Sequence, residues 1–299
     1  MSAMNTATIR VWAPPHVAAN HPPRAISHRT RGHAAGFIRR LMSPGDLGRI
    51  VKPFVFLDLF AGEGRHAPPL DAGWHPHSGI ATVTVVLDGT TRYAETTGRT
   101  GALPAGGVEW MRAGGGVWHT GTAEPGAVRG FQLWVALPPE LENAASESQY
   151  VQPDQVPVVG PARVVLGAYQ GAVSPIAAPP MTYLSLTLED GERWTFEPPA
   201  GHDVAWVAVM DGELRTPSRI TGGELAIFDR ATAPIEFVAE GTTRFVLGAA
   251  PLHPHHLVLG TYSVHTSREA LQRGETEIRR IGRTLHTDGK RSYALRSFG

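Results

Sequence analysis

The sequence of 299 residues contains no cysteine, which excludes disulfide bonds, thiolate metal ligands and thiol nucleophiles. It also lacks an excess of either charge, because 27 basic residues match 27 acidic ones. Balanced charge gives no indication of binding to nucleic acid or to a membrane surface, and we expect neither. No apolar run approaches the ~20 residues of a membrane span, and the N-terminus lacks a signal-peptide pattern. We therefore expect a cytoplasmic protein.

Long helical patterns are scarce, whereas glycine and proline are frequent, at 34 and 25 residues. Short apolar and β-branched runs are separated by turn residues, as in residues 54–60, 80–87 and 130–137. Strands at this spacing predict an antiparallel barrel or sandwich. The Asp88-Gly89 pair, which directly follows one run, predicts a hairpin turn.

Two pairs of segments indicate an internal repeat. Residues 85–89 resemble 208–212, each ending in Asp-Gly, and residues 105–109 resemble 221–225, each with paired glycines. Two copies of one β-barrel is the simplest explanation. The predicted order is an extended arm over 1–25, an N-terminal barrel over 26–140, a linker over 141–160, a C-terminal barrel over 161–265, and a short helix with a tail over 266–299. We expect Ser267 to cap that helix.

A His-X-His pair, His75 and His77, stands directly before the run 80–87. Side chains two apart on a strand point to the same face, so both imidazoles can converge on one ion. This is a metal-site hypothesis, and the remaining ligands must come from elsewhere in the chain. His253 and His255 repeat the spacing after the last strand of the second barrel. We interpret that second pair, with the adjacent His256, as solvated loop histidines.

Several segments of the first half match one family. They are Phe54-Val55-Phe56-Leu57-Asp58, His75-Pro76-His77-Ser78-Gly79, Gly106-Gly107-Val108-Glu109-Trp110-Met111, Val117-Trp118-His119 and Gln132-Leu133-Trp134-Val135. Through them the chain resembles the pirins, which are two-domain cupins. The resemblance is specific across about residues 50–140 and much weaker in the second half. It implies an all-β fold, a bicupin of two antiparallel cupin-type β-barrels.

In pirins the N-terminal barrel binds a metal, usually iron, through a His-X-His pair, a later histidine and a glutamate two residues further on. By position, the resemblance implies His75, His77 and His119 as the metal ligands. The glutamate position holds Gly121, and the general cupin alternative, four residues after the pair, holds Ala81. The cofactor implied is one divalent metal ion, Fe(II) first, with Zn, Ni or Cu also open. A metal-free site is a further alternative.

Glu109 and Glu124 are near in sequence and are candidates to replace the missing carboxylate. The second barrel differs at the corresponding places. Aligned on the repeated turns, the three histidines fall opposite Pro198, Ala200 and Ile235. We therefore expect a C-terminal barrel without metal ligands.

Some pirins oxidise flavonols such as quercetin, so the resemblance implies a metal-dependent dioxygenase of the quercetin 2,3-dioxygenase type with a small aromatic substrate. In that chemistry a carboxylate is expected to take the substrate proton, and Gly121 stands in its place. The sequence therefore leaves open whether the protein is an enzyme, and it assigns no catalytic residue. One alternative is a non-catalytic, metal- or ligand-responsive regulator that binds a partner protein. Another is a metal-free cupin that binds a small molecule.

Overall fold

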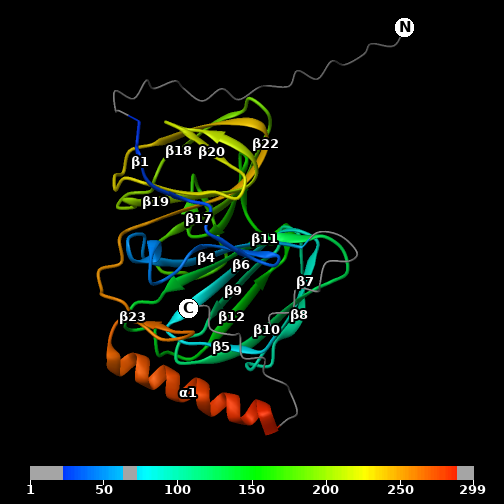
Figure 1. Cartoon of the computed structure of the whole chain (residues 1–299), viewed down its shortest axis with the longest axis vertical. Coiled ribbons are helices and arrows are strands. Elements are labelled where there is room, and N and C mark those ends of the chain that lie inside the picture. Colours follow the sequence, from blue (N-terminus) through cyan, green and yellow to red (C-terminus); the bar gives the residue numbers. More distant parts are fainter. Residues whose placement is uncertain (1–22, 63–72, 288–299) are drawn as a thin grey trace.

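The structure, a computed structural model, describes residues 23–62 and 73–287 (Figure 1). Nearly all of the predicted N-terminal arm and the end of the predicted C-terminal tail lie outside these residues. The named strand pairs of the described chain are antiparallel, and one isolated parallel bridge joins Ser78 to Ser263. The prediction of an all-β protein is confirmed.

The N-terminal barrel is made of two sheets. The seven-stranded sheet has the order β12 (Glu147–Val151), β9 (Val108–Arg112), β6 (Ile80–Asp88), β11 (Val128–Ala136), β4 (Phe54–Gly62), β3 (Ile38–Met42) and β2 (His33–Ala35). The four-stranded sheet has the order β5 (His75–His77), β10 (Val117–Ala123), β7 (Thr90–Glu95) and β8 (Thr100–Pro104). Figure 1 shows the four-stranded sheet closing the side of the barrel next to α1 (Arg268–Thr287).

The C-terminal barrel is made of the nine-stranded sheet. Its main path is β1 (Ile26–Thr30), β21 (Leu225–Phe228), β19 (Val204–Arg215), β22 (Ile235–Ala250), β17 (Thr182–Leu188), β14 (Ala162–Leu166) and β13 (Val158–Val159). Two further strands pair with β22 and β19, namely β18 (Arg193–Phe196) and β20 (Arg219–Thr221). The remaining short elements are β15 (Ala168–Tyr169) with β16 (Ala172–Val173), β23 (Val258–Leu259) with β24 (Val264–His265), and the 3-10 turns η1 (Leu47–Arg49) and η2 (Pro153–Gln155).

The largest apolar core lies between the two barrels. Strand β6 shows how the sequence builds it: Ala81, Val83 and Val85 belong to this core, and the alternate residues Thr82 and Thr84 face the other way, into the N-terminal barrel. The opposite wall comes from the nine-stranded sheet, which contributes apolar residues of β19 and β22. A separate apolar cluster fills the inside of the C-terminal barrel. The two barrel interiors therefore differ: buried polar groups stand beside smaller apolar clusters in the first, whereas one large apolar cluster fills the second.

The two predicted Asp-Gly turns meet at the boundary between the barrels. Asp88 pairs in register with Arg129, and Asp211 pairs in register with Arg244. Each arginine also reaches the aspartate of the other barrel: Arg244 Nη1 lies 2.9 Å from Asp88 Oδ1, and Arg129 Nη2 hydrogen-bonds Asp211 Oδ1. The repeat inferred from sequence is thus visible as a reciprocal cluster of four charged side chains.

The Asp88-Gly89 turn is not a hairpin, so that prediction was wrong. Strand β6, before the turn, pairs with β9 and β11, whereas β7, after it, pairs with β8 and β10. The chain crosses here from one sheet of the barrel to the other. Gly89, at φ 76°, supplies the left-handed backbone of this corner.

Strand membership crosses the predicted domain boundaries. Strand β1 comes from the predicted N-terminal barrel but pairs with β21 of the C-terminal sheet. The predicted linker over 141–160 contains β12, which pairs with β9, and β13, which pairs with β14. The edge of a sheet carries unpaired backbone N–H and C=O groups. A short polar segment can hydrogen-bond to them through its own backbone, so it forms a strand without the apolar pattern by which strands are predicted. The division into folding units at residues 140 and 161 stays a prediction.

The C-terminal segment returns to the N-terminal barrel. Helix α1 has 20 residues, longer than the short helix expected, and Ser267 Oγ caps it by accepting from the Ala270 backbone N–H at 3.1 Å. The helix packs against β5 and β10, as Figure 1 shows. Trp118 Nε1 of β10 donates to the Ile278 carbonyl at 2.7 Å, which fixes the helix to the barrel. No helix among the described residues is long and apolar enough to span a membrane.

Candidate metal centre

Strands β5 and β10 bring three histidines to one face of the four-stranded sheet. His75 and His77 are two apart on β5, and His119 on β10 stands directly opposite His75. Residues two apart share a face, and so do directly paired residues, so the register alone aims all three imidazoles into the barrel. Strand β5 is separate from β6, and Gly79, at φ 76°, turns the chain between them. The predicted convergence of His75 and His77 holds, on a shorter strand than expected.

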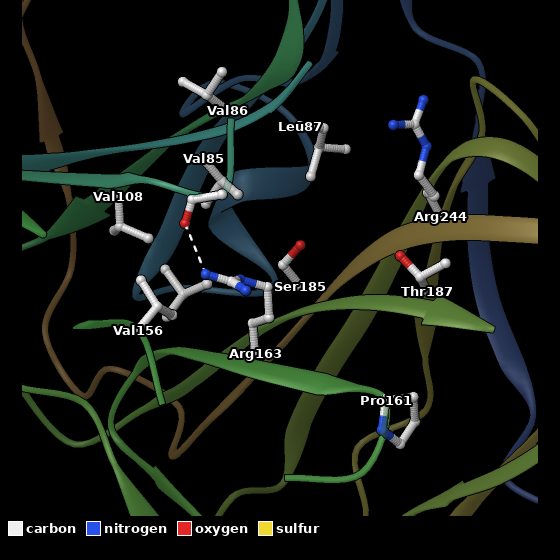
Figure 2. A pocket seen from close by; sticks show the side chains of 12 residues that line it. Val85, Val86, Leu87, Val108, Val156, Pro161, Arg163, Ser185, Thr187 and Arg244 are labelled. Atoms are coloured by element: carbon white, nitrogen blue, oxygen red, sulfur yellow. Dashed lines mark hydrogen bonds between the residues drawn. The ribbon is translucent and has the colours of Figure 1, made fainter. Parts of the chain in front are cut away.

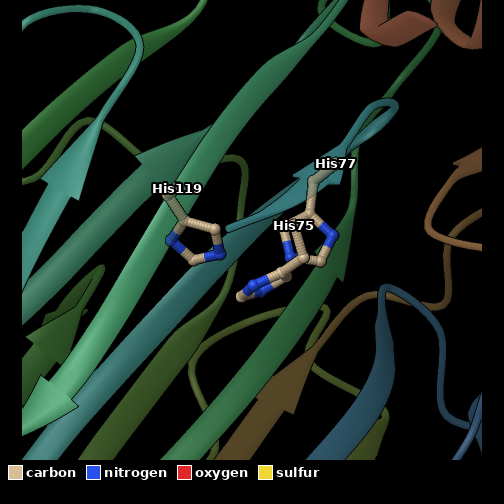
Figure 3. Close-up of side chains that lie close together, drawn as sticks. All are labelled: His75, His77 and His119. Carbon is tan, nitrogen blue, oxygen red and sulfur yellow. The ribbon is translucent and has the colours of Figure 1, made fainter. Parts of the chain in front are cut away.

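The three imidazoles form a compact, buried group (Figure 3). Ring centroids lie 4.4 Å apart for His75 and His119, 5.0 Å for His75 and His77, and 5.1 Å for His77 and His119. One ligand atom from each ring lies within 4.8 Å of the others. This is the only group of three or more metal-ligating side chains found within the described ranges. The structure therefore brings together the three histidines that the sequence singled out.

Hydrogen bonds at the far side of two rings fix which nitrogen faces the site. His75 Nδ1 lies 2.9 Å from the Gly73 carbonyl oxygen, and His77 Nδ1 lies 3.2 Å from the Tyr262 carbonyl oxygen. A carbonyl only accepts, so each Nδ1 carries the proton and each Nε2 keeps its lone pair. That is the tautomer in which an imidazole binds a metal through Nε2.

Burial keeps these rings neutral. Burial and then the neighbouring His119 lower the pKa of His75 to about 3, against an opposing effect of the Gly73 hydrogen bond. Burial, followed by His75 and His119, also holds the pKa of His77 well below its usual value. Because desolvation disfavours the charged imidazolium, both rings are unprotonated at neutral pH and can donate a lone pair.

The donor set fits a divalent metal ion. Nε2 of His77 and Nε2 of His119 are buried and have no hydrogen-bond partner in the described part of the chain. Burying such groups without a partner is unfavourable, and a bound cation would satisfy both. Three neutral nitrogen ligands with further positions open suit Zn, Fe, Ni or Cu.

Neither family carboxylate position supplies a ligand. Gly121 lies on the same face of β10 as His119, and a Cβ built there meets nothing within 4 Å. Ala81 faces the core between the barrels. Glu124 is bound by Arg92 at 2.7 Å and is outside the histidine group. Glu109 is also outside it, although its Oε1 lies 3.8 Å from His119 Nδ1.

Sequence reasoning missed three residues of the site. Glu95 is paired with His119 across β10 and β7, so His75, His119 and Glu95 form one row across three strands. Trp134 of β11 packs edge-on against His77, at 4.8 Å between ring centroids. Tyr262 follows the second barrel, and its backbone carbonyl bonds His77 Nδ1 while its ring lies edge-on to the His77 ring at 6.4 Å between centroids. The alternation of β11 could have indicated Trp134, whereas only the tertiary structure places Tyr262.

The second His-X-His segment does not repeat the site. His255 and His256 are exposed, as interpreted, but His253 is buried. The ring centroids of His253 and His255 lie 5.5 Å apart, and in the residues described no third ligand joins them. At the position aligned with His119, the second barrel has Ile235, which is buried in its apolar interior.

A cavity of about 230 Å³ between the barrels is a different place from the histidines (Figure 2). Its walls include Val85 and Val108 of the N-terminal barrel and Ser185 of the C-terminal one. Both arginines in its lining are engaged. Arg163 Nη2 donates to the Gly106 carbonyl at 3.1 Å, the bond drawn in Figure 2, and Arg244 belongs to the four-charge cluster. The cavity therefore marks the barrel boundary, and its two arginines serve contacts within the protein.

Two antiparallel β-barrels, with a buried histidine triad in the first alone among the described residues, define a bicupin of the metal-binding type. The Pirin family model matches residues 37–135. A relative in Pseudomonas aeruginosa, named as a candidate quercetin 2,3-dioxygenase, is 32% identical over 76% of this chain and 85% of its own. The chain belongs to the pirin family.

Other known proteins agree with that assignment. A pirin-like protein of Caulobacter vibrioides is 38% identical over 54% of this chain, and the match spans 62% of the Caulobacter protein. A crystal structure of quercetin 2,3-dioxygenase from Acinetobacter baumannii has a TM-score of 0.73 at 24% identity, covering 88% of this chain and 96% of that one. The pirin YhhW of Escherichia coli, crystallised with nickel(II), has a TM-score of 0.59 at 20% identity, covering 77% and 98%. At these identities the two structures support the fold alone.

Proposed function

We propose that His75, His77 and His119 hold one divalent metal ion and that the protein is an oxygenase for a flavonol-like substrate of the quercetin type. The observation that carries the proposal is the pair of buried, unpartnered Nε2 atoms of His77 and His119, with His75 beside them. The substrate class is inferred from relatives named as candidate quercetin 2,3-dioxygenases, in Pseudomonas aeruginosa among others.

The protein's own part in this chemistry is to bind and to orient. A divalent metal, when bound, would polarise a substrate oxygen and bring it beside O₂. The hydrogen bonds to Gly73 and Tyr262 hold His75 and His77 in the metal-binding tautomer. Trp134 packs edge-on against His77 and forms one side of the site. Fe(II) is our first choice of metal, and an all-nitrogen donor set is equally compatible with Zn, Ni or Cu.

A second candidate function is a non-catalytic, metal-responsive protein that binds a partner. One observation favours it: position 121, on the face of β10 that carries His119, has no side chain to accept a substrate proton. Such a protein would bind metal in the same place but would not turn over a flavonol.

Elemental analysis of the purified 299-residue protein, supplied anaerobically with Fe(II), tests the metal. We expect about one equivalent per chain, and loss of that metal in His119→Ala. Thr120→Ala is the matched control, because Thr120 neighbours His119 but faces the other side of β10. Absence of metal from the wild-type protein would contradict the site.

Oxygen uptake with quercetin then separates the two functions. The oxygenase proposal predicts O₂ consumption and loss of flavonol absorption, both abolished in His119→Ala. Metal-loaded protein that consumes no O₂ with quercetin would favour the non-catalytic function.

A further inference from the structure

The interior of the N-terminal barrel holds two buried carboxylates, Glu95 and Glu109. Glu95 accepts hydrogen bonds from Ser148 Oγ at 2.6 Å and from Tyr150 Oη at 2.9 Å. Glu109 Oε2 accepts a hydrogen bond from Thr84 Oγ1, and its Oε1 lies 3.8 Å from His119 Nδ1. Among the described residues, no arginine or lysine forms an ion pair with either carboxylate.

Of the three other buried carboxylates among the described residues, two are paired with arginine, and the third, Glu142, accepts hydrogen bonds from Thr266 and lies 3.4 Å from His265 Nδ1. Asp58 is held by Arg40 at 2.8 Å, and Glu224 is held by Arg29 at 2.8 Å. A buried carboxylate without a cation is unfavourable, because desolvation is not offset by a nearby opposite charge. The two acidic groups beside the histidines therefore point to a positive charge that the protein chain does not supply.

Glu109 lies beside one of the two ring nitrogens of His119. The Nδ1 edge of the His119 ring faces Glu109, whereas its Nε2 is buried without a partner. A carboxylate at Nδ1 favours the tautomer with a proton on Nδ1 and a lone pair on Nε2. The separation of 3.8 Å is longer than a direct hydrogen bond, and a small rotation of either side chain would close it. Thr84, by binding Oε2, turns the other carboxylate oxygen toward His119.

We infer that Glu109 is the positioning residue of this metal centre and supplies its negative charge through His119, in place of a directly bound carboxylate at position 121. The inference rests on the proposed three-histidine site. Glu95 differs from Glu109 in its contacts, because both of its oxygens are bound by the edge strand β12. It provides a comparison with the same charge in the same barrel.

The decisive experiment is titration of metal-free protein with Zn²⁺ and Co²⁺ by calorimetry. We expect Glu109→Gln to weaken the binding of both ions by about 10- to 100-fold, the range found for outer carboxylate partners of metal-bound histidines. The visible absorption of the Co²⁺ complex should also change, because His119 becomes a weaker donor. Glu95→Gln, whose carboxylate has no contact with a histidine ring nitrogen, should weaken binding less and change the Co²⁺ spectrum less than Glu109→Gln does.

Moving the negative charge from position 109 to position 121 tests whether the metal site needs one carboxylate beside its histidines. A Cβ at Gly121 meets no neighbour, so Gly121→Glu can place a carboxylate on the face of the histidines. In the Glu109→Gln background this second change should restore binding. Thr84→Val keeps the Glu109 charge but removes the hydrogen bond that aims it, and it should weaken binding by a smaller factor. This variant also tests the inference if Glu109→Gln fails to fold.

The outcomes separate the two proposals. Wild-type protein that binds neither ion would overturn the metal site itself, and the role of Glu109 would fall with it. Wild-type protein that binds metal, with Glu109→Gln binding equally well and giving the same Co²⁺ spectrum, would overturn the role of Glu109 alone. If Glu109→Gln does not fold, unchanged affinity in Thr84→Val overturns it. Equal weakening of metal binding by Glu95→Gln and Glu109→Gln, with the same spectral change, would also count against the role of Glu109. The negative charge of the barrel interior would then strengthen binding in a general way and not through His119.

Discussion

Nδ1 of His77 lies 3.2 Å from the carbonyl oxygen of Tyr262, which comes 185 residues later in the chain. Neighbouring bonds strengthen this connection: Ser78 Oγ donates to Ser263 Oγ at 2.8 Å and lies 3.0 Å from His265 Nε2. The strand that carries two of the three histidines is thus held by a segment that follows the second barrel. Metal binding and docking of the C-terminal segment are therefore expected to stabilise each other, because linkage is reciprocal.

Hydrogen exchange can measure this linkage. Saturating Zn²⁺ should slow amide exchange over residues 258–285, since it stabilises the His77 tautomer that donates to Tyr262. At a metal concentration 100 times the Kd, binding stabilises the folded state by about 2.7 kcal/mol. His119→Ala with the same Zn²⁺ is the control and should show no slowing. Protection that rises in β5 but not in the C-terminal segment would contradict the linkage.

Gly274→Ala should destabilise the protein, although alanine is the better helix former. Alanine gains about 1 kcal/mol in an exposed helix. Here, however, its Cβ would meet Ser78 Oγ at 2.5 Å, Ser78 Cβ at 2.9 Å and His265 Nε2 at 2.7 Å. Overpacking a buried site of this kind costs about 1–3 kcal/mol. We expect a net loss of up to about 2 kcal/mol in urea unfolding.

The control for that variant is Gln272→Ala, at an exposed position of the same helix. It should change the free energy of unfolding by less than about 0.5 kcal/mol. If Gly274→Ala proves as stable as the wild type, α1 does not depend on its close approach to Ser78 and His265.

Gly121→Glu in the wild-type background should tighten metal binding. Position 121 shares the His119 face of β10, and the space around it is open, so a carboxylate can join the three imidazoles without displacing a neighbour. We expect the Kd for Zn²⁺ to fall by about 10-fold or more, equivalent to about 1.4 kcal/mol. Thr120→Glu carries the same charge on the opposite face and should leave the Kd unchanged. Unaltered affinity in Gly121→Glu would count against placing residue 121 beside the metal.

Asp211→Asn should lower stability in a way that depends on pH. Burial raises the pKa of Asp211, but hydrogen bonds from Arg129 and Arg244 outweigh this effect and hold it below the ordinary 3.8. A depressed carboxyl pKa stabilises the folded state above pH 3.8, and this contribution is lost as the pH falls through the folded-state value. At pH 7 we expect Asp211→Asn to cost about 1–3 kcal/mol, as for other hydrogen bonds to charged groups.

Urea unfolding of wild type and Asp211→Asn between pH 7 and pH 3 provides the measurement. The difference between them should narrow below about pH 4, where Asp211 becomes protonated. Glu236→Gln breaks the exposed pair with Arg193 and should change stability little at any pH. A difference that stays constant or grows toward low pH would show that the charged cluster does not set the stability of the barrel boundary.

The sequence by itself determined the fold class and the histidine site. Apolar alternation along 80–87 and 130–137 defines strands with one face in the core, because side chains two apart must share a face. The repeated Asp-Gly turns revealed the duplication, now seen in the cluster of Asp88, Asp211, Arg129 and Arg244. The spacing of His75 and His77 was enough to predict that their imidazoles converge, whereas assigning His119 to the same site required the family resemblance.

Only the tertiary structure decided how distant segments complete the site. Strand register placed Glu95 beside His119 and turned Glu109 toward its Nδ1, and short local patterns do not specify register between strands far apart in sequence. The sequence likewise gave no signal that β1 would join the other barrel or that Tyr262 would bind His77. A backbone carbonyl accepts a hydrogen bond whatever side chain its residue carries, so the residue type at position 262 does not predict that hydrogen bond. The chain's local patterns define its strands, and the packing of remote segments defines the environment of its histidines.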